Sequence, residues 1–596
     1  MTLESLDIKQ QKLRQLQQIL PEIFEDGEII PEKLKDVFAD EVNESREHYS
    51  FTWAGKRDCY KTIREKTNAT LKVDEDTTIP DGDNVFIEGD NLEVLKLLQL
   101  SYHKKVKMIY IDPPYNKDKD FVYSDTWGDS IQNYLIQTDQ LRDEGYTTTK
   151  TNSTGRRHTN WLNMIYPRLW LSRNLLKDDG VIFVSIDDDE VHNLRKVMDE
   201  IYGEENFVGH TVWKHTEQSK NDEPYFSRQY NSILAYKKSD VLDKLRLPRT
   251  QKDNKNYSNL DNDINGEWRS GDVRSPSYRK TLCFDIETPS GNIISPPKNG
   301  WRWAKSEVNK KIDSGEIIFN DDETNIIRKI YLKNQDGRTP ENLWIGEEYG
   351  TTRSANSELK ELFENETPFD TPKPTKLIRK LCQLFKDDKS FICLDFFAGS
   401  GTTAHAVMAL NQEDGGNRKY ILVQLPEATD VKSEAYKAGY TKISDITKER
   451  IKRAMQKLDY KEGFKSFRLD NSNFQIFKEV KKRPDMSYEK IEEMLKMSMF
   501  HENILTQGAK ELDIVYEVGL KNGFTLSAKV DEVKTDKYSF MTLSEEERVF
   551  YFSFDKKITG DIVHDVPKDA KLICYEKALT TNVKLNLREN LDLEVL

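Results

Sequence analysis

The segment Asp112-Pro113-Pro114-Tyr115 combines a carboxylate and an aromatic ring within four residues, and it is the strongest candidate for a catalytic motif in the sequence. It follows Val106–Ile111, an apolar run that predicts a buried strand, and the two prolines end this strand and stiffen the turn. Open α/β sheets bind ligands beyond the carboxyl ends of such strands. There, a carboxylate can accept a hydrogen bond from an exocyclic amine while the tyrosine ring stacks on a heterocycle, which suits a nucleobase turned out of its duplex. An ordinary polar turn after a strand is the alternative.

A second motif, residues 391–403, is typical of a buried strand that runs into a glycine-containing loop and then a helix. Gly399 and Gly401 let a ligand approach the backbone, and the start of the helix offers unpaired N–H groups. A single Gly-x-Gly also fits a structural turn or another nucleotide site. No Gly-Lys-Ser/Thr follows, which excludes a phosphate-binding P-loop.

Together, the two motifs resemble those of the amino-methyltransferases that use S-adenosylmethionine. The resemblance implies that the Asp-Pro-Pro-Tyr segment holds the target amine and that the glycine loop holds the methionine part of the cofactor. The cofactor contacts implied in and beside this loop are Asp395, Phe397, Ala398, Gly399, Ser400, Gly401 and Thr402.

Three positions outside the loop are further cofactor candidates. Asp90 precedes a predicted helix, either as its N-cap or as a ligand to the adenine or ribose, and these roles are compatible. Lys373 belongs to a segment that resembles the family's Lys-Pro segment, which helps to close the cofactor pocket. Gln424 ends the next predicted strand, where many relatives place an acid on the ribose. Glu427 lies three residues later, so the ribose contact stays open between them.

Candidate substrate contacts follow the catalytic turn. Phe121 or Tyr123 is expected to form a second wall against the extruded base. The polar stretch Thr147–His158 contains Arg156 and Arg157 and predicts a loop, either one that contacts DNA or one that is simply disordered.

The catalytic motif precedes the cofactor motif, and this order resembles the permuted β group of DNA amino-methyltransferases. The implied fold is an α/β, Rossmann-like methyltransferase core with an inserted α+β target-recognition domain, a helical N-terminal addition and an α+β C-terminal addition. We predict a helical region at residues 1–60, the catalytic half at 61–205, the recognition domain at 206–365, the cofactor-binding half at 366–460 and a C-terminal domain for dimer or restriction-subunit contacts at 461–596.

Composition is consistent with a large enzyme that acts on nucleic acid. The 596 residues carry a formal charge of −13, yet Phe207–Lys280 contains 14 basic and 10 acidic residues, and phosphate attraction depends on such local patches. No window approaches the ~18 apolar residues of a membrane span, and no signal peptide is evident. Five scattered cysteines without a Cys-x-x-Cys pair argue against structural zinc and for a reducing cytoplasm. Methyl transfer needs no metal, so Asp187–Asp189 are interpreted as helix caps.

Five longer segments indicate one subgroup within the β group: residues 50–57, 291–303, 443–454, 463–478 and 514–523. They resemble the modification (Mod) subunit of type III restriction–modification systems. This resemblance implies an adenine-N6 methyltransferase that acts on a short asymmetric sequence in double-stranded DNA. It further implies a homodimer and a separate ATP-dependent restriction (Res) subunit.

Three other functions compete with this interpretation. A cytosine-N4 methyltransferase has the same architecture but more often a serine in place of Asp112. An RNA methyltransferase is possible, although the large insertion favours duplex DNA. A DNA-binding specificity subunit without catalysis would not need the intact Asp112, Tyr115, Gly399 and Gly401.

Overall fold

The chain folds into two compact units, each with its own core. The computed structural model describes residues 7–25, 28–31, 33, 50–117, 141–142, 145–146, 154–219, 224–474 and 505–596. The larger core unit contains Met1–Asp243, Glu341–Cys382 and Asp388–Leu596, and the inserted unit contains Lys244–Pro340 and Gln383–Asp387.

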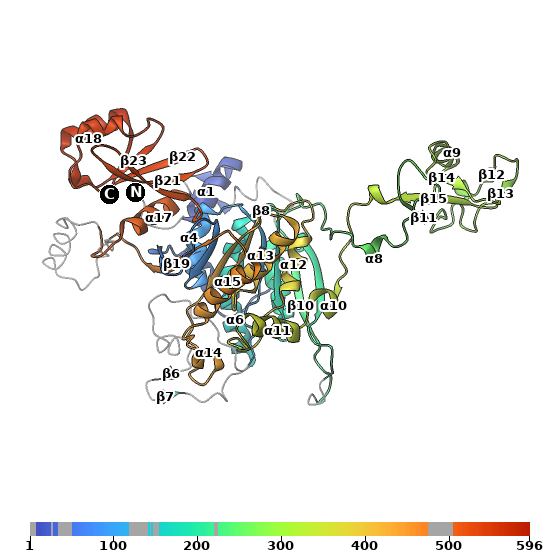
Figure 1. Cartoon of the computed structure of the whole chain (residues 1–596), viewed down its shortest axis with the longest axis horizontal. Coiled ribbons are helices and arrows are strands. Elements are labelled where there is room, and N and C mark those ends of the chain that lie inside the picture. Colours follow the sequence, from blue (N-terminus) through green and yellow to red (C-terminus); the bar gives the residue numbers. More distant parts are fainter. Residues whose placement is uncertain are drawn as a thin grey trace. The chain divides into compact units, whose positions relative to one another are not determined.

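A ten-stranded sheet organises the core unit (Figure 1). Six neighbouring strands at its centre run parallel, in the spatial order β8 (Leu176–Ile186), β5 (Val106–Ile111), β17 (Ile392–Asp395), β18 (Lys419–Gln424), β4 (Asn84–Glu88) and β19 (Phe464–Asn471). On one side, β10 (Tyr230–Lys237), β9 (Phe207–Lys214) and β16 (Leu343–Trp344) follow, and on the other side β3 (Ala69–Val73). The predicted α/β fold and the strand at Val106–Ile111 are confirmed.

The central strands are buried on both faces, which explains their continuous apolar runs. In β5, Ile109 and Ile111 pack with the helices of one face, whereas Met108 and Tyr110 lie buried against the other. The first face carries α3 (Lys56–Arg64), α4 (Asn91–Ser101), α6 (Thr154–Leu175) and α7 (Val191–Tyr202). The second carries α11 (Thr352–Leu362), α12 (Thr375–Gln383), α13 (Thr402–Asp414) and α15 (Ile443–Leu458) (Figure 1).

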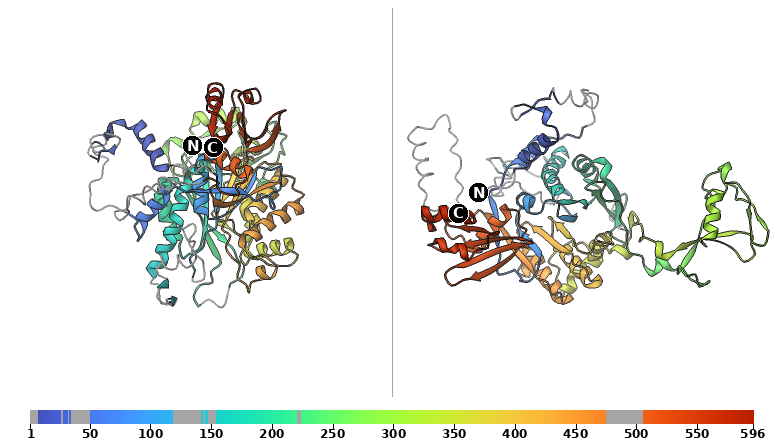
Figure 2. Two further views of the ribbon diagram at one scale, coloured as in Figure 1. Left: turned by 90° about the vertical axis from the view of Figure 1, so that its left-hand side faces the viewer. Right: turned by 90° about the horizontal axis from the view of Figure 1, so that it is seen from above.

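The C-terminal residues form a second sheet within the core unit, drawn in red in Figure 2. Its order is β20 (Lys529–Lys534), β21 (Ser539–Glu545), β22 (Arg548–Ser553), β23 (Lys571–Cys574) and β24 (Asp592–Val595). Side chains alternate across it, so that Leu572 packs toward α18 (Thr581–Asn590) and Ile573 toward α17 (Glu511–Lys521). The adjacent α17 also contacts α4 and β3, which joins this sheet to the central one.

The inserted unit is built on a small antiparallel sheet of β11 (Trp268–Gly271), β15 (Ile326–Tyr331) and β14 (Ile317–Phe319). Helix α9 (Lys305–Asp313) and the hairpin of β12 (Ile286–Glu287) and β13 (Ile293–Ile294) complete it. Trp301 is buried at its centre and donates its indole N–H to the Phe284 carbonyl at 2.8 Å. The recognition domain was predicted at residues 206–365. The inserted unit contains fewer of these residues, because β9, β10 and β16 belong to the central sheet of the core unit.

One close backbone approach constrains the edge of the central sheet. A Cβ atom at Gly463 would lie 2.1 Å from the carbonyl oxygens of both Ile79 and Pro80. The facing Gly82 is equally confined, since a Cβ atom there would lie 1.9 Å from the Gly463 carbonyl oxygen. Only glycine at both positions lets the start of β19 reach this segment.

We predict that Gly463→Ala destabilises the protein by about 1–3 kcal/mol, because backbone atoms cannot move aside as a flexible side chain can. The measurement is the free energy of unfolding of the core unit in denaturant. Gly209→Ala is the matched control, because a Cβ atom in that part of β9 would meet no atom within 4 Å. Equal effects of the two substitutions would contradict the packing argument.

Candidate active site

Strands β5 and β17 bring the two sequence motifs to one edge of the central sheet. They pair in parallel, with Leu394 beside Ile109, so their carboxyl ends point the same way. The chain then continues from β5 to β8 on one side and from β17 to β18 on the other. Such a reversal of strand order leaves a crevice between diverging connections, where α/β sheets bind ligands. Asp112, directly after β5, and Asp395, the last residue of β17, both lie at this edge.

Two side chains hold the Asp112 carboxylate. The Tyr115 hydroxyl donates to Oδ1 at 2.8 Å, and the Lys373 ammonium forms an ion pair with Oδ2. Burial, followed by the negative charge of Asp112, raises the pKa of Tyr115 well above its usual value, so the phenol stays protonated and acts as a donor. Because a carboxylate has about four acceptor positions, these two bonds leave room for a further N–H group.

The turn after Asp112 is fixed by residues that the sequence analysis did not single out. The buried Trp161 of α6 donates its indole N–H to the Pro114 carbonyl at 2.7 Å. Asn116 adopts a left-handed conformation with φ of 62°, and its amide donates to the Glu190 carboxylate at 2.6 Å. Asparagine tolerates this conformation better than most residues. The only signal in the sequence was therefore the asparagine after Tyr115, since Trp161 looks like any core residue of an amphipathic helix.

The glycine loop is folded around the Asp395 carboxylate. Its Oδ1 accepts the Phe397 N–H at 3.1 Å, and its Oδ2 accepts the Thr403 hydroxyl at 2.6 Å. Burial raises the pKa of Asp395 to about 7, and the nearby charge of Asp112 acts in the same direction. Gly399 and Gly401 have φ of 51° and 81°, which L-residues with side chains seldom adopt.

Side chains from two other elements hold the loop from outside. Gln424, at the end of β18, accepts the Gly399 N–H at 2.7 Å, and the Thr447 hydroxyl of α15 donates to the Gly399 carbonyl at 2.6 Å. One guanidinium nitrogen of Arg450, also on α15, donates to the hydroxyl oxygens of Ser400 and Thr402 at 2.8 Å each. Thr447 and Arg450 were not predicted from the sequence, because residues so far from the loop along the chain carry no signal of contact with it.

Lys373 connects the two motifs. Its ammonium forms an ion pair with the Asp112 carboxylate and lies 5.3 Å from the centre of the Tyr115 ring. Its main-chain carbonyl accepts a hydrogen bond from the Thr402 hydroxyl at 3.2 Å. Lys373 was predicted to help to close the cofactor pocket. It lies between the Asp112 carboxylate and the glycine loop.

Comparison with known proteins agrees with this arrangement. Residues 106–456 match the DNA methylase family. The chain is 36% identical over 474 residues to the type III restriction-modification enzyme StyLTI Mod subunit of Salmonella typhimurium, a match covering 75% of this chain and 71% of that protein. It is also 36% identical over 504 residues to the EcoP15I Mod subunit of Escherichia coli, covering 75% and 76%. The chain belongs to the Mod subunits of type III restriction–modification enzymes. It is a DNA methyltransferase of such a system.

Asp90 of this Mod subunit is the N-cap of α4, which confirms that part of its interpretation. Its Oδ1 accepts the N–H groups of Leu92 and Glu93 at 2.9 and 3.1 Å, and its Oδ2 lies 3.3 Å from the buried Arg168. The next residue, Asn91, donates to the Phe396 carbonyl at 2.7 Å. The start of α4 therefore abuts the glycine loop, and a contact of Asp90 with the cofactor stays a prediction.

The expected substrate contacts are only partly described. Phe121, Tyr123 and residues 147–153 lie outside the described residues, as does the side chain of Arg156. The prediction of a loop over Thr147–His158 is wrong for its last residues, because α6 begins at Thr154. Tertiary contacts favour the helix there: the Arg157 carbonyl accepts the Asn116 amide at 3.2 Å, and its guanidinium lies 3.7 Å from Asp189.

The capping role predicted for Asp187–Asp189 is also wrong. The N-cap of α7 is Glu190, and no side-chain capping bond is present at this helix start. The three aspartates instead face Lys117, Tyr230 and Arg157, respectively. Among the described residues, no group of three or more His, Cys, Asp or Glu side chains could hold a metal ion. No helix in the described part of the chain is long and apolar enough to cross a membrane.

The raised pKa of Asp395 predicts a pH-dependent stability. Unfolded aspartate titrates near ~3.9, so between about pH 4 and pH 7 the unfolded chain loses a proton that the folded chain keeps. Folding stability should therefore fall as the pH rises through this window, by on the order of 4 kcal/mol from this residue, and then level off. In Asp395→Asn, the unfolding free energy should fall less between pH 5 and pH 7.5 than in the wild type. If the unfolding free energies of the two proteins changed equally over this pH range, Asp395 would already be ionised at pH 5.

Proposed function

We propose that this Mod subunit transfers a methyl group from S-adenosylmethionine to the N6 atom of adenine in a short asymmetric sequence of double-stranded DNA. The observation that carries the proposal is the Asp112 carboxylate, held by Tyr115 and Lys373 at the same sheet edge as the glycine loop. Aspartate at this position, rather than serine, favours adenine over cytosine N4.

The residues of the turn can activate a weakly nucleophilic amine. The lone pair of adenine N6 is delocalised into the ring. Asp112 and the Pro113 carbonyl would accept its two N–H groups, which favours a pyramidal nitrogen with an available lone pair. The Tyr115 ring would stack on the extruded base, with Phe121 or Tyr123 as a second wall. Extrusion costs roughly a few kcal/mol, which stacking and contacts to the displaced strand must offset.

The glycine loop suits the proposed cofactor. When bound, S-adenosylmethionine supplies an electrophilic methyl group. Its methionine part would lie on Gly399–Thr402 and the start of α13, where left-handed glycines and a fully buried guanidinium are present. Because Gln424 already accepts the Gly399 N–H, we favour Glu427 for the ribose. Burial raises the pKa of Glu427, and a hydrogen bond from a ribose hydroxyl would offset part of this cost.

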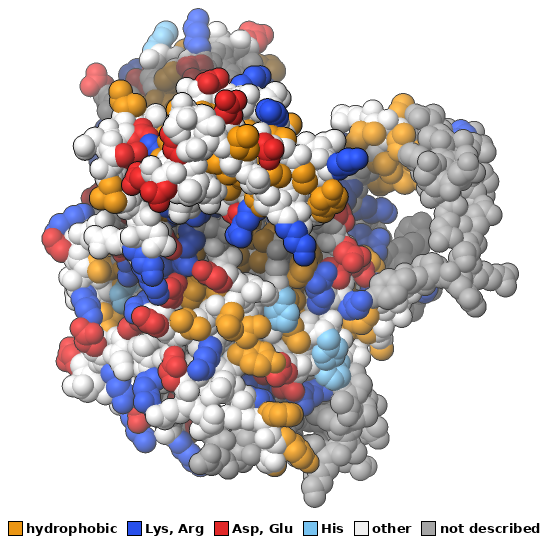
Figure 3. All heavy atoms as spheres, turned by 90° about the vertical axis from the view of Figure 1, so that its right-hand side faces the viewer, with side chains coloured by type: hydrophobic (Ala, Val, Ile, Leu, Met, Phe, Trp, Pro, Cys, Tyr) orange, Lys and Arg blue, Asp and Glu red, His pale blue; other side chains and the backbone are white. Residues whose placement is uncertain are grey.

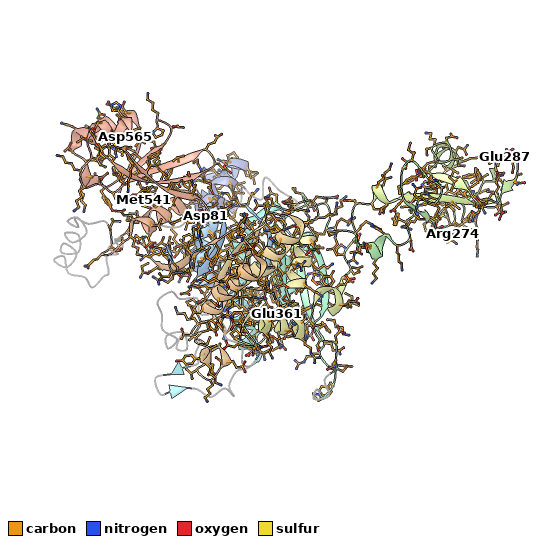
Figure 4. All side chains as sticks on the ribbon, viewed as in Figure 1. Asp81, Arg274, Glu287, Glu361, Met541 and Asp565 are labelled. Carbon is orange, nitrogen blue, oxygen red and sulfur yellow. The ribbon has the colours of Figure 1, made fainter. Side chains whose placement is uncertain are left out.

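The inserted unit offers a surface for reading DNA. Figure 3 shows that basic, acidic and apolar side chains are mixed on one face of the molecule, so attraction of phosphates requires a local cluster. A groove of about 790 Å³ in the inserted unit provides one, and its basic lining residues are Arg274, Arg279, Lys298 and Arg302. Arg274, labelled in Figure 4, donates hydrogen bonds from Nε and Nη2 to the two carboxylate oxygens of Asp272 at 2.9 and 3.3 Å. An arginine fork oriented in this way matches the O6 and N7 atoms of guanine.

Partners follow from the family. We propose a homodimer that works with a separate Res subunit, because the relatives are Mod subunits of type III restriction-modification enzymes and the sequence has no Gly-Lys-Ser/Thr ATP loop. The five cysteines are scattered along the sequence without a Cys-x-x-Cys pair, which supports a reducing, cytoplasmic location.

Methylation of DNA in vivo tests the reaction and its specificity together. Expressed in a host without DNA methylation, the wild type should produce N6-methyladenine in a single short asymmetric motif, read by single-molecule sequencing. Asp112→Ala should abolish the mark, because the target amine loses its acceptor, while DNA binding in a gel-shift assay persists. N4-methylcytosine in place of N6-methyladenine would establish the cytosine-N4 alternative, and no mark at all would favour a binding-only subunit.

Arg274→Ala tests the groove. We expect binding to cognate DNA to weaken by about 1–3 kcal/mol and specificity to relax at one guanine, because the fork would no longer contact the base edge. Arg279→Ala should instead weaken binding to all sequences and lower the salt dependence by about one unit of slope. Lys310→Ala, on the exposed side of α9, is the control and should leave both properties unchanged. Unaltered specificity in Arg274→Ala would place recognition elsewhere.

A further inference from the structure

Arg450 is a buried cation beneath the glycine loop. Its side chain is fully buried, and one terminal nitrogen donates to the hydroxyl oxygens of Ser400 and Thr402. Its Nε atom and its other terminal nitrogen have no hydrogen-bond partner in the described part of the chain. Burying a charged group without full hydrogen bonding is costly, so a protein retains one chiefly where a partner of opposite charge arrives.

Within the described ranges, no carboxylate forms an ion pair with Arg450, whereas the two other cations near His405 are paired. Arg379 pairs with Glu413, and Lys457 pairs with Glu361 at 2.7 Å. The carboxylate whose charge acts on Arg450 is Glu358, and its Oε2 atom is engaged by the N–H and hydroxyl groups of Thr375. Burial lowers the pKa of Arg450 to about 10, so the guanidinium remains charged at neutral pH.

A second source of positive potential lies at the same place. Helix α13 begins at Thr402, and the unpaired N–H groups of its first turn carry a partial positive charge. His405, in that turn, adds no charge of its own, because burial and then the proximity of Arg450 lower its pKa to about 3. Without an anion, the guanidinium and the helix start repel each other, and an anion over Ser400–Thr402 would relieve this repulsion.

We infer that Arg450 makes the glycine loop a binding site for the carboxylate of the cofactor's methionine part. Arg450 is a positioning residue, since it acts through Ser400 and Thr402 and through its field. It donates to both hydroxyl oxygens, which obliges each hydroxyl to direct its own hydrogen elsewhere. Thr402 donates to the Lys373 carbonyl at 3.2 Å, and the acceptor that the described residues offer the Ser400 hydroxyl is the Thr402 hydroxyl oxygen at 3.4 Å. A carboxylate over the loop would be a stronger acceptor than this long contact, so Ser400 is the hydroxyl that can turn its hydrogen toward it. The inference rests on the proposed cofactor and adds the group that recognises its negative end.

The test compares two ligands that differ only in the carboxylate: S-adenosylmethionine and decarboxylated S-adenosylmethionine. Their dissociation constants are measured by calorimetry on the full chain. The wild type should prefer the carboxylate-bearing ligand, and Arg450→Met should reduce this preference by roughly tenfold or more, since a charged hydrogen-bonded contact is lost. Affinity for the decarboxylated ligand should change by less than about threefold. Arg453→Met, on the same helix and paired with Glu449, is the control and should keep the preference.

Ser400→Ala provides a second variant that alters only one hydroxyl, so the test does not depend on Arg450→Met being folded. It should reduce the same preference in the same direction. Equal losses of both ligands in Arg450→Met, with an unchanged preference in Ser400→Ala, would mean that Arg450 only supports the loop and would overturn the inference. If the wild type binds neither ligand, the proposed cofactor itself fails; if it binds both with equal affinity, only the carboxylate site fails.

Discussion

The parallel pairing of β17 with β5 is the contact on which the site depends. These strands belong to segments separated by the whole inserted unit, and neither motif can form a site without the other. The pairing places Asp112 and Asp395 at one sheet edge, and the connections leave in opposite directions, so the space above the edge stays open. Because both strands are buried on both faces, a shift of register would move each side chain into space that is packed for a side chain of another shape, and this ties the spacing of the two carboxylates to the core.

The charged side chains on the two sides of this edge differ in how fully they are paired with opposite charges. At the end of β5, the Asp112 carboxylate is paired with the Lys373 ammonium. At the glycine loop, Asp395 is buried with neutral donors, and Arg450 is hydrogen-bonded to hydroxyl groups alone among the residues that the structure describes. A site that must receive a zwitterionic ligand benefits from fixed, incompletely neutralised groups, because the ligand's own charges complete the pairing at the moment of binding.

In the proposed function, catalysis and recognition use different kinds of structure. The acceptor turn is held rigidly by the Trp161 and Glu190 hydrogen bonds, as methyl transfer requires close positioning of two reactants. The inserted unit has its own small core around Trp301 and is joined to the core unit through few segments. Such a unit can change its surface without disturbing the central sheet, which suits a part that reads DNA.

The strand at Val106–Ile111, the strand–loop–helix around Gly399 and the family could all be predicted from the sequence, because they depend on local apolar runs, prolines and glycines. Tertiary structure decided which distant side chains complete the site. Trp161, Glu190, Thr447 and Arg450 approach the two motifs only through packing of α6, α7 and α15, and their spacing along the chain has no period that marks them. Tertiary contacts also decided where α6 begins and that Asp187–Asp189 form pairs rather than caps. Local propensity governs single elements, whereas long-range burial and charge pairing select the partners of each side chain.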